Sequence, residues 1–162
     1  MGHQVQEQTS SRLIFEPAHP DHAYCLAPRL REVDKEEWSI NFSEGFPNVE
    51  SMMVQAIGEA QTKVDAEVEI ISSDDGVLRG MWGYSVWETP TNVLYPFGAI
   101  WMASDDVLFD KYKKEFTRIA RTKVFPMLDN MFSVYGNLVY AKNSKHVEWL
   151  ARAGFQCHGT FE

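Results

Sequence analysis

A change of hydrophobic period part-way along the chain constrains the fold more than any other feature. Segments 66–73, 77–88 and 95–104 have strand character, and the first two flank Asp74-Asp75-Gly76, a sequence typical of a hairpin turn. Over 106–130 the period becomes helical, with one apolar stripe formed by Phe109, Tyr112, Phe116, Ile119, Ala120 and Val124. The sequence therefore predicts an antiparallel three-stranded meander followed by a long helix.

Shorter elements surround this centre. We expect strands at 12–18, 131–140 and 155–161, and helices at 22–31, 33–40, 48–62 and between Asn143 and Gly154. Asp21 is the expected cap of the first helix, and Pro126 should bend or end the long one. Because that helix joins two neighbouring strands, they should run parallel. The predicted fold class is α/β (α+β), with a mixed, mostly antiparallel sheet and helices on both faces.

Length and charge limit the possible functions. The 162 residues suffice for one domain, expected at 12–162 after a flexible segment at 1–11. Fifteen Lys and Arg against twenty-three Asp and Glu give 15 − 23 = −8, a net charge that repels a phosphate backbone. Nucleic acid is therefore not an expected partner.

The sequence gives little sign of export, membrane insertion or metal binding. The N-terminus carries no signal peptide, and no apolar run reaches the length of a membrane-spanning helix. Cys25 and Cys157 are too few for a disulfide framework, which favours a reducing cytosol. His19 and His22 form an H-x-x-H pair without further ligands nearby in sequence, so no metal site is predicted.

The stretch 143-NSKHVEWLARAGF-155 resembles the C-terminal signature N-x-x-A-x-x-L-Y-E-K-x-G-F of the GNAT superfamily of N-acetyltransferases. Asn143 fills its first position, Trp149 its leucine position, and Gly154 with Phe155 its closing pair. The expected order of elements over 12–161 is also similar to the GNAT fold. The resemblance implies a GNAT-like domain that binds acetyl-CoA or another acyl-CoA and transfers the acyl group to an amine.

A narrower resemblance concerns the same helix. The pattern N-x-x-H-x-x-W-L-x-x-x-G-F, carried by His146, Trp149 and Leu150, is similar to GNAT-like proteins of short-tailed bacteriophages. It implies a place in the host cytoplasm or the phage virion, and a phage structural protein or a host protein as partner.

In the GNAT superfamily the acyl-CoA lies where the fourth and fifth strands separate, and its pyrophosphate rests on the motif Q/R-x-x-G-x-G/A at the start of the central helix. The best register here is 111-KYKKEF-116, which puts Lys114 and Phe116 at the glycine positions. Acidic residues also gather near the helix start, namely Asp105, Asp106 and Asp110. The phosphate cradle is therefore expected to be degenerate, and the candidate cofactor-binding residues are Lys111, Lys113, Lys114 and Asn143.

The proton donor of the resemblance is also replaced. The superfamily's tyrosine follows the leucine position, and here that position is Leu150, which transfers no proton. Substitutes nearby in sequence are Tyr135, Tyr140, His146, Cys157 and His158. Each has a structural alternative: half-buried strand tyrosines, an exposed helix histidine and a small core cysteine. Glu88, near the end of a strand, is the preferred candidate for a general base over Glu67 and Glu69.

Two functions remain open at this point. One is an acyl-CoA-dependent N-acyltransferase with a remodelled cofactor loop. The other is a non-catalytic phage virion, assembly or host-takeover accessory protein that uses the fold for binding. Fold alone does not determine function, so the site must decide between them. The joint loss of the glycine cradle and of the tyrosine favours lost or altered catalysis.

Overall fold

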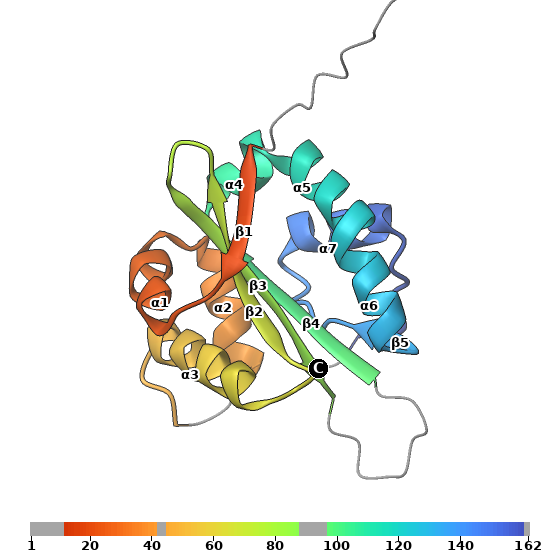
Figure 1. The fold of residues 1–162 in the computed structure, drawn as a ribbon, viewed down its shortest axis with the longest axis horizontal. Coiled ribbons are helices and arrows are strands. Elements are labelled where there is room, and N and C mark those ends of the chain that lie inside the picture. The colour runs from red at the N-terminus through yellow and green to blue at the C-terminus, as the bar shows by residue number, and fades with distance from the viewer. Residues whose placement is uncertain (1–11, 42–44, 88–96, 161–162) are drawn as a thin grey trace, which may run out of the picture.

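The computed structural model describes residues 12–41, 45–87 and 97–160, which form one mixed sheet with helices on both faces (Figure 1). Its five strands lie in the order of the sequence, β1-β2-β3-β4-β5. The first four are antiparallel neighbours, and β4 pairs with β5 in parallel. The strands are β1 (Leu13–Pro17), β2 (Glu67–Ser73), β3 (Leu78–Val86), β4 (Phe97–Ser104) and β5 (Val134–Gly136). The predicted meander and its parallel fifth strand are therefore confirmed.

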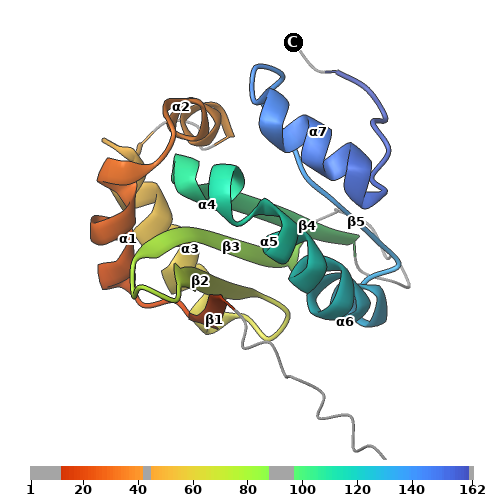
Figure 2. The same cartoon turned by 90° about the horizontal axis from the view of Figure 1, so that it is seen from above.

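The helices form two groups (Figures 1 and 2). The first group is α1 (Pro20–Leu26), a 3-10 turn (Ala27–Arg29), α2 (Glu32–Asn41) and α3 (Val49–Thr62). The second group is α4 (Asp106–Lys111), α5 (Lys113–Ile119), a π-helix (Ala120–Val124), α6 (Phe125–Met131) and α7 (Ser144–Ala153). Each group covers one face of the sheet, as the mixed architecture predicts.

Alternation along the central strands supplies both cores. Met81 and Ala103 pack with α1, α2 and α3, whereas Trp82, Tyr84 and Met102 pack with the second group of helices. Successive strand residues point to opposite faces, so one strand can serve two cores only if nearly every position is apolar. The sequence of β3, LRGMWGYSV, meets this requirement in its central part.

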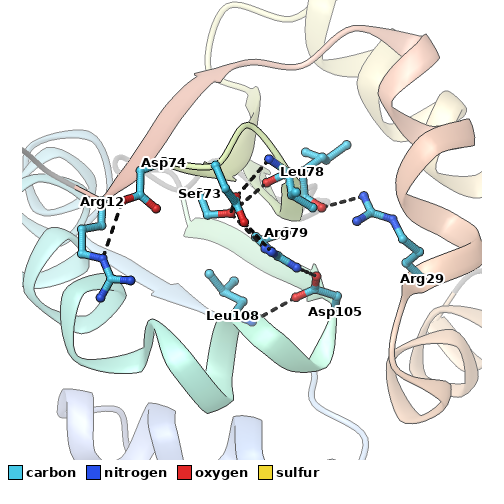
Figure 3. A network of polar contacts seen from close by, with 10 residues as sticks. Arg12, Arg29, Ser73, Asp74, Leu78, Arg79, Asp105 and Leu108 are labelled. Atoms are coloured by element: carbon cyan, nitrogen blue, oxygen red, sulfur yellow. Dashed lines mark hydrogen bonds and ion pairs between the residues drawn. The ribbon is translucent and has the colours of Figure 1, made fainter.

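The expected hairpin turn connects β2 and β3. Gly76 has φ of 80°, in the left-handed region that glycine adopts without strain. Arg79, three residues later, reaches Asp75 on the turn at 3.2 Å. It also reaches Asp105 at 3.1 Å (Figure 3). The hairpin is thereby tied to the start of the helical run.

The long helix is interrupted at two places, one of them next to Pro126. It kinks at Tyr112 between α4 and α5, and the π-helix immediately precedes α6, whose second residue is Pro126. Proline lacks the N–H that a regular helix needs, and a local widening of the helix accommodates that loss.

Two strand predictions are wrong in extent. Only Val134–Gly136 of the segment 131–140 is strand, because the chain then leaves β4 and the N–H of Tyr140 donates to Glu37 instead. Residues 155–160 contain no strand, and Phe155 packs on Phe125 and Tyr135 rather than extending the sheet. The rest of that predicted strand lies outside the described residues.

The start of α1 also differs from the prediction. His19, not Asp21, is the N-cap residue: its Nδ1 accepts from the N–H of Asp21, and its own N–H donates to Nδ1 of His22. Both histidines of the H-x-x-H pair therefore serve the helix terminus. Within residues 12–41, 45–87 and 97–160, no cluster of three or more potential ligands could hold a metal ion. No helix in those ranges is long and apolar enough to cross a membrane.

Candidate functional site

The candidate site is the opening between β4 and the chain that follows β5. The two strands are paired only at Phe97–Ala99 and Val134–Gly136. Beyond these pairs β4 continues to Ser104, while residues 137–140 turn away from it. A parallel pair that separates in this way leaves room for a ligand between the strands.

Two cavities flank this opening, and Ile100, Trp101 and Asn137 line both of them. The larger, of about 150 Å³, lies toward α2 and is also lined by Glu37, Trp38, Trp87 and Leu138. The smaller, of about 40 Å³, lies toward α5, α6 and α7 and is also lined by Trp82, Phe116, His146, Trp149 and Leu150. All five tryptophans of the chain therefore line one or both cavities.

A buried ion pair closes the outer end of the opening. Arg31 donates from Nη2 to Oδ1 of Asp34 at 2.6 Å and from Nε to Oδ2 at 3.0 Å. Oδ2 of Asp34 also accepts the N–H of Ser104 at 3.0 Å, and the carbonyl of Ser104 accepts the N–H of Arg31. The last residue of β4 is thus held by both partners, and its backbone groups are not free to bind a ligand.

Asn143 connects this pair to α7. Its Oδ1 accepts from Arg31 at 3.2 Å, and its Nδ2 lies 2.9 Å from Oδ1 of Asp34 and 3.2 Å from Oε2 of Glu37. The side chain is 1% exposed and forms no cap hydrogen bond. The residue placed first in the GNAT-like signature therefore joins α2 to α7, and its amide is already occupied.

Glu37 lies between this cluster and the larger cavity. Burial raises the pKa of its carboxyl above the usual value, and the charge of Asp34 adds to the shift. Hydrogen bonds from Tyr140 N–H and Asn143, and the charge of Arg31, act in the opposite direction without cancelling it. A carboxylate in this position is stabilised by any further cation or donor that reaches it.

His146 lies between the cluster and the smaller cavity. Burial lowers the pKa of its imidazole to about 4, so the ring is neutral at pH 7. Nδ1 lies 2.9 Å from Nδ2 of Asn143 and 3.9 Å from Oδ1 of Asp34. Nε2 has no hydrogen-bond partner among the described residues, and the ring is 3% exposed. The alternative of an exposed helix histidine is therefore wrong.

The tyrosine candidates lie apart from the cavities. The hydroxyl of Tyr135 donates to Asp129 at 3.0 Å, and burial together with this carboxylate raises its pKa to about 12. Tyr140 contributes its backbone to the cluster, and its ring lies 5.7 Å from Nζ of Lys142. Neither is among the residues that line the two cavities. The base candidate Glu88 lies outside the described residues.

The remaining residues singled out near the C-terminus lie in different environments. Cys157 is exposed, so the expectation of a small core cysteine is wrong, and His158 is exposed as well. Trp149 is buried, and its Nε1 donates to Thr117 at 2.9 Å. Gly154 ends α7 with φ of 107°, which confirms the predicted C-terminal stop.

The segment matched to the glycine motif is helical. Residues 111–116 span the kink between α4 and α5, and the N–H of Phe116 donates to the carbonyl of Tyr112 at 2.9 Å. Phe116, at the last glycine position, is 5% exposed and packs against Phe109 and Trp149. A pyrophosphate does not fit here as it fits a glycine loop, because Phe116 fills the space where a glycine would stand and its own N–H is already bonded.

The candidate lysines lie on the outside of this segment. Lys111 and Lys114 are exposed, and Lys113 is half-buried. Nζ of Lys111 lies 5.4 Å from the centre of the Tyr112 ring. They carry positive charge at the surface, and none of them lines either cavity.

The first helix after β4 offers no phosphate site either. Only Asp105 separates β4 from α4, so there is no loop between them. Its Oδ1 accepts the N–H of Leu108 at 2.9 Å, and its Oδ2 pairs with Arg79 (Figure 3). The carboxylate of Asp105 itself occupies the position where the helix terminus would attract an anion.

Sequence reasoning missed the charged residues that organise the site. Arg31, Asp34 and Glu37 recur every three positions in 31-REVDKEEW-38. Arg31 immediately precedes α2, and Asp34 and Glu37 lie on α2 with Trp38. A charge run of this kind usually forms a solvated face. The signal that could have identified them is the helical spacing of Asp34, Glu37 and Trp38, because a helix rarely places a tryptophan among charges that remain in water.

Comparisons with solved structures bear on the fold. An aminoglycoside N-acetyltransferase in complex with CoA shares 13% identity and a TM-score of 0.59 with this chain, over 96% of it and 95% of the other. A glucosamine-6-phosphate N-acetyltransferase from Arabidopsis thaliana shares 9% identity and a TM-score of 0.56 with this chain, over 93% of it and 95% of the other. A transcriptional regulator from Bacillus halodurans shares 10% identity and a TM-score of 0.63, over 93% of this chain and 97% of the other. The chain has the GNAT fold.

At these identities the likeness establishes the GNAT fold and nothing finer. No family model matches the chain. No curated protein matches its sequence. The fold that the resemblance of Asn143 to Phe155 implied is therefore confirmed, and the functional meaning of that segment depends on the site.

Proposed function

We propose that this chain is a GNAT-fold protein that acts by binding a small molecule in the β4–β5 opening, without acyl-CoA-dependent transfer. The observation that carries the proposal is Phe116, which is buried where a glycine would stand beside phosphate and whose N–H donates to the carbonyl of Tyr112. The Asp105 cap of α4 supports it, because a carboxylate already occupies the start of that helix.

Loss of the proton donor supports the same conclusion. Leu150 stands at the tyrosine position and lines the smaller cavity with an apolar side chain. Tyr135, the nearest strand tyrosine, holds its proton against Asp129, and its raised pKa makes it a weaker acid than a free tyrosine. Among the residues that the structure describes, a leaving thiolate would therefore find no ready tyrosine donor at this opening.

One specific observation favours a second function, an acyl-CoA-dependent N-acyltransferase. The two cavities meet at Ile100, Trp101 and Asn137 from opposite faces of the sheet, an arrangement suited to two substrates. In that case Lys111, Lys113 and Lys114 would hold the phosphates by charge, and His146 would donate a hydrogen bond from Nε2 into the smaller cavity. Binding through surface lysines depends steeply on salt.

The setting we propose is a phage-encoded accessory protein of the host cytoplasm or the virion. Its support is the placement of His146, Trp149 and Leu150, the residues that resemble those of short-tailed phage proteins, around one cavity. A phage structural protein or a host protein is the corresponding partner.

Isothermal calorimetry with CoA and with acetyl-CoA, at low and at high salt, tests these functions. We expect no saturable binding at millimolar ligand. Micromolar binding that survives high salt, with transfer to any amine, would overturn the binding-only proposal. Binding that fails at high salt and in Lys113→Ala or Lys114→Ala would favour the second function.

A further inference from the structure

The buried cluster beside the larger cavity contains more negative than positive charge. Arg31 is its one cation among the described residues, whereas Asp34 and Glu37 are both carboxylic acids. His146 is neutral at pH 7 because burial lowers its pKa to about 4. One cation against two carboxylates leaves one negative charge without a partner when both acids are ionised. Buried charge of this kind is stabilised by a proton or by a further cation.

The unbalanced charge falls on Glu37. Asp34 is held by Arg31 through two hydrogen bonds and by the N–H of Ser104. Among the described residues, Glu37 receives only neutral donors, the N–H of Tyr140 at 2.8 Å and Nδ2 of Asn143 at 3.2 Å, and both reach Oε2. Among the described residues Oε1 has no hydrogen bond, although the side chain is 4% exposed and lines the larger cavity.

The other walls of the larger cavity are aromatic. Trp38, Trp87 and Trp101 line it, and the rings of Trp38 and Trp101 pack edge to face at 5.0 Å. Its volume of about 150 Å³ matches the size of apolar cavities that bind a benzene-sized molecule. Indole faces attract cations as well as apolar groups. The site thus combines apolar walls, aromatic faces and one buried acceptor of a hydrogen bond.

We propose that the larger cavity binds a protonated primary amine carried on a compact apolar body. The ammonium group donates to Oε1 of Glu37, and the apolar body lies between Trp38, Trp87 and Trp101. This inference rests on the proposed function, in which the opening works by binding, and it names the class of ligand. A neutral ligand of the same shape would fill the cavity but leave the buried charge unpaired.

Proton binding at Glu37 competes with the amine. The groups that face this carboxyl are Asp34 and Arg31 on the α2 side, Asn143 at the start of α7 and the backbone of Tyr140. Because its pKa is raised above the usual value, acid pH protonates Glu37 and removes the charge that the ammonium group needs. Amine binding should therefore strengthen as pH rises from 5 to 7.5, while the amine itself stays protonated.

The test compares two ligands of matched shape, cyclohexylmethylamine and cyclohexylmethanol, by isothermal calorimetry on the whole chain at pH 7.5. The expected result is binding of the amine that is at least about tenfold tighter than binding of the alcohol. Equal binding of the two, or no binding of the amine at millimolar concentration, would overturn the proposal.

A pair of variants locates the contact. Glu37→Gln keeps the shape and an acceptor for Tyr140 N–H, and it should reduce amine affinity at least about tenfold without changing alcohol affinity. Glu36→Gln removes the same charge from the neighbouring exposed position and should leave both affinities unchanged. An equal effect of the two substitutions would contradict a contact at Glu37. If Glu37→Gln does not fold, the pH series on the unaltered protein still tests the contact.

The outcomes also separate this inference from the proposed function. Amine binding together with tight CoA binding and acyl transfer would keep the ligand class and make the amine the acceptor. Absence of both kinds of binding would overturn the inference and the proposed role of the opening together. Absence of CoA binding with selective amine binding is the result that we expect.

Discussion

Asp105 pairs with Arg79 at 3.1 Å while its other oxygen caps α4 through the N–H of Leu108. One carboxylate therefore links the β2–β3 hairpin, the end of β4 and the start of the helical run. The side chains of Arg79 and Asp105 are only 14% and 8% exposed, so this pair is poorly screened by solvent.

Removal of this carboxylate should destabilise the domain. Asp105→Ala deletes the cap, worth about 1 kcal/mol, and leaves a mostly buried arginine without one of its two carboxylate partners, so we expect a total loss of roughly 2–3 kcal/mol. Urea unfolding followed by circular dichroism measures it. Asp106→Ala is the matched control, because the neighbouring side chain is exposed, and it should cost less than about 1 kcal/mol. Equal losses in the two variants would show that the cap and the ion pair of Asp105 do not add to the free energy of unfolding.

His146 should make stability depend on pH. Its pKa is lowered to about 4 in the folded protein, whereas an unfolded histidine has the ordinary pKa of 6.5. The unfolded state therefore binds more protons between these values, and stability is fully present above pH 6.5 and is lost as pH falls toward 4. The contribution is roughly 3 kcal/mol. Denaturant unfolding at pH 7 and pH 5 should show part of this loss, and the part due to His146 should vanish in His146→Gln. His158→Gln, an exposed control, should retain it.

Trp149 should be one of the costliest side chains to truncate. It is 7% exposed, its ring lies 5.0 Å from that of Phe116, and its Nε1 donates to Thr117. Trp149→Ala should lower the free energy of unfolding by about 3–5 kcal/mol. Val147→Ala, on the exposed side of the same helix, should cost less than about 1 kcal/mol. A small loss in the tryptophan variant would mean that this side chain does not hold α7 on the core.

Gly83 and Gly58 should respond in opposite directions to alanine. A Cβ on Gly83 would stand 2.6 Å from the Trp101 ring and 2.8 Å from the carbonyl of Glu67, so Gly83→Ala must displace a tryptophan that lines both cavities. We expect a loss of about 1–3 kcal/mol and a shift of tryptophan emission. Gly58 lies inside α3 with nothing within 4 Å of the added atom. Gly58→Ala should stabilise by up to about 1 kcal/mol, and thermal unfolding of both variants would show whether the signs differ.

The fold was largely predictable because its signals are local. The turn at Asp74–Gly76, the helical stripe from Phe109 to Val124 and the stop at Gly154 each depend on residues a few positions apart. Where prediction was wrong, a distant residue decided the outcome. The segment after Gly136 leaves the sheet because Tyr140 finds Glu37, more than one hundred positions earlier in the chain.

The site was less predictable for the same reason. The loss of the glycine cradle is visible in the sequence, since Lys114 and Phe116 replace small residues. The partnership of Glu37 with Asn143 is not, because neither the spacing nor the composition of α2 indicates which helix will cover it. The burial of His146 depends on the same distant contacts and reversed the expectation of an exposed residue.

The buried cluster joins segments of the chain that are synthesised at different times. Asp34 and Asn143 are 109 positions apart. During synthesis, nearly the whole domain must therefore be made before the α2 carboxylates can bond to Asn143 at the start of α7. An intermediate that lacks α7 would bury Glu37 against apolar side chains without hydrogen bonds from Asn143 or the N–H of Tyr140. Burial of this unpaired carboxyl would offset most of the free energy gained by packing α2 early. We therefore expect folding to be all-or-none, with the docking of α7 as a late and obligatory step and no stable fragment ending before Asn143.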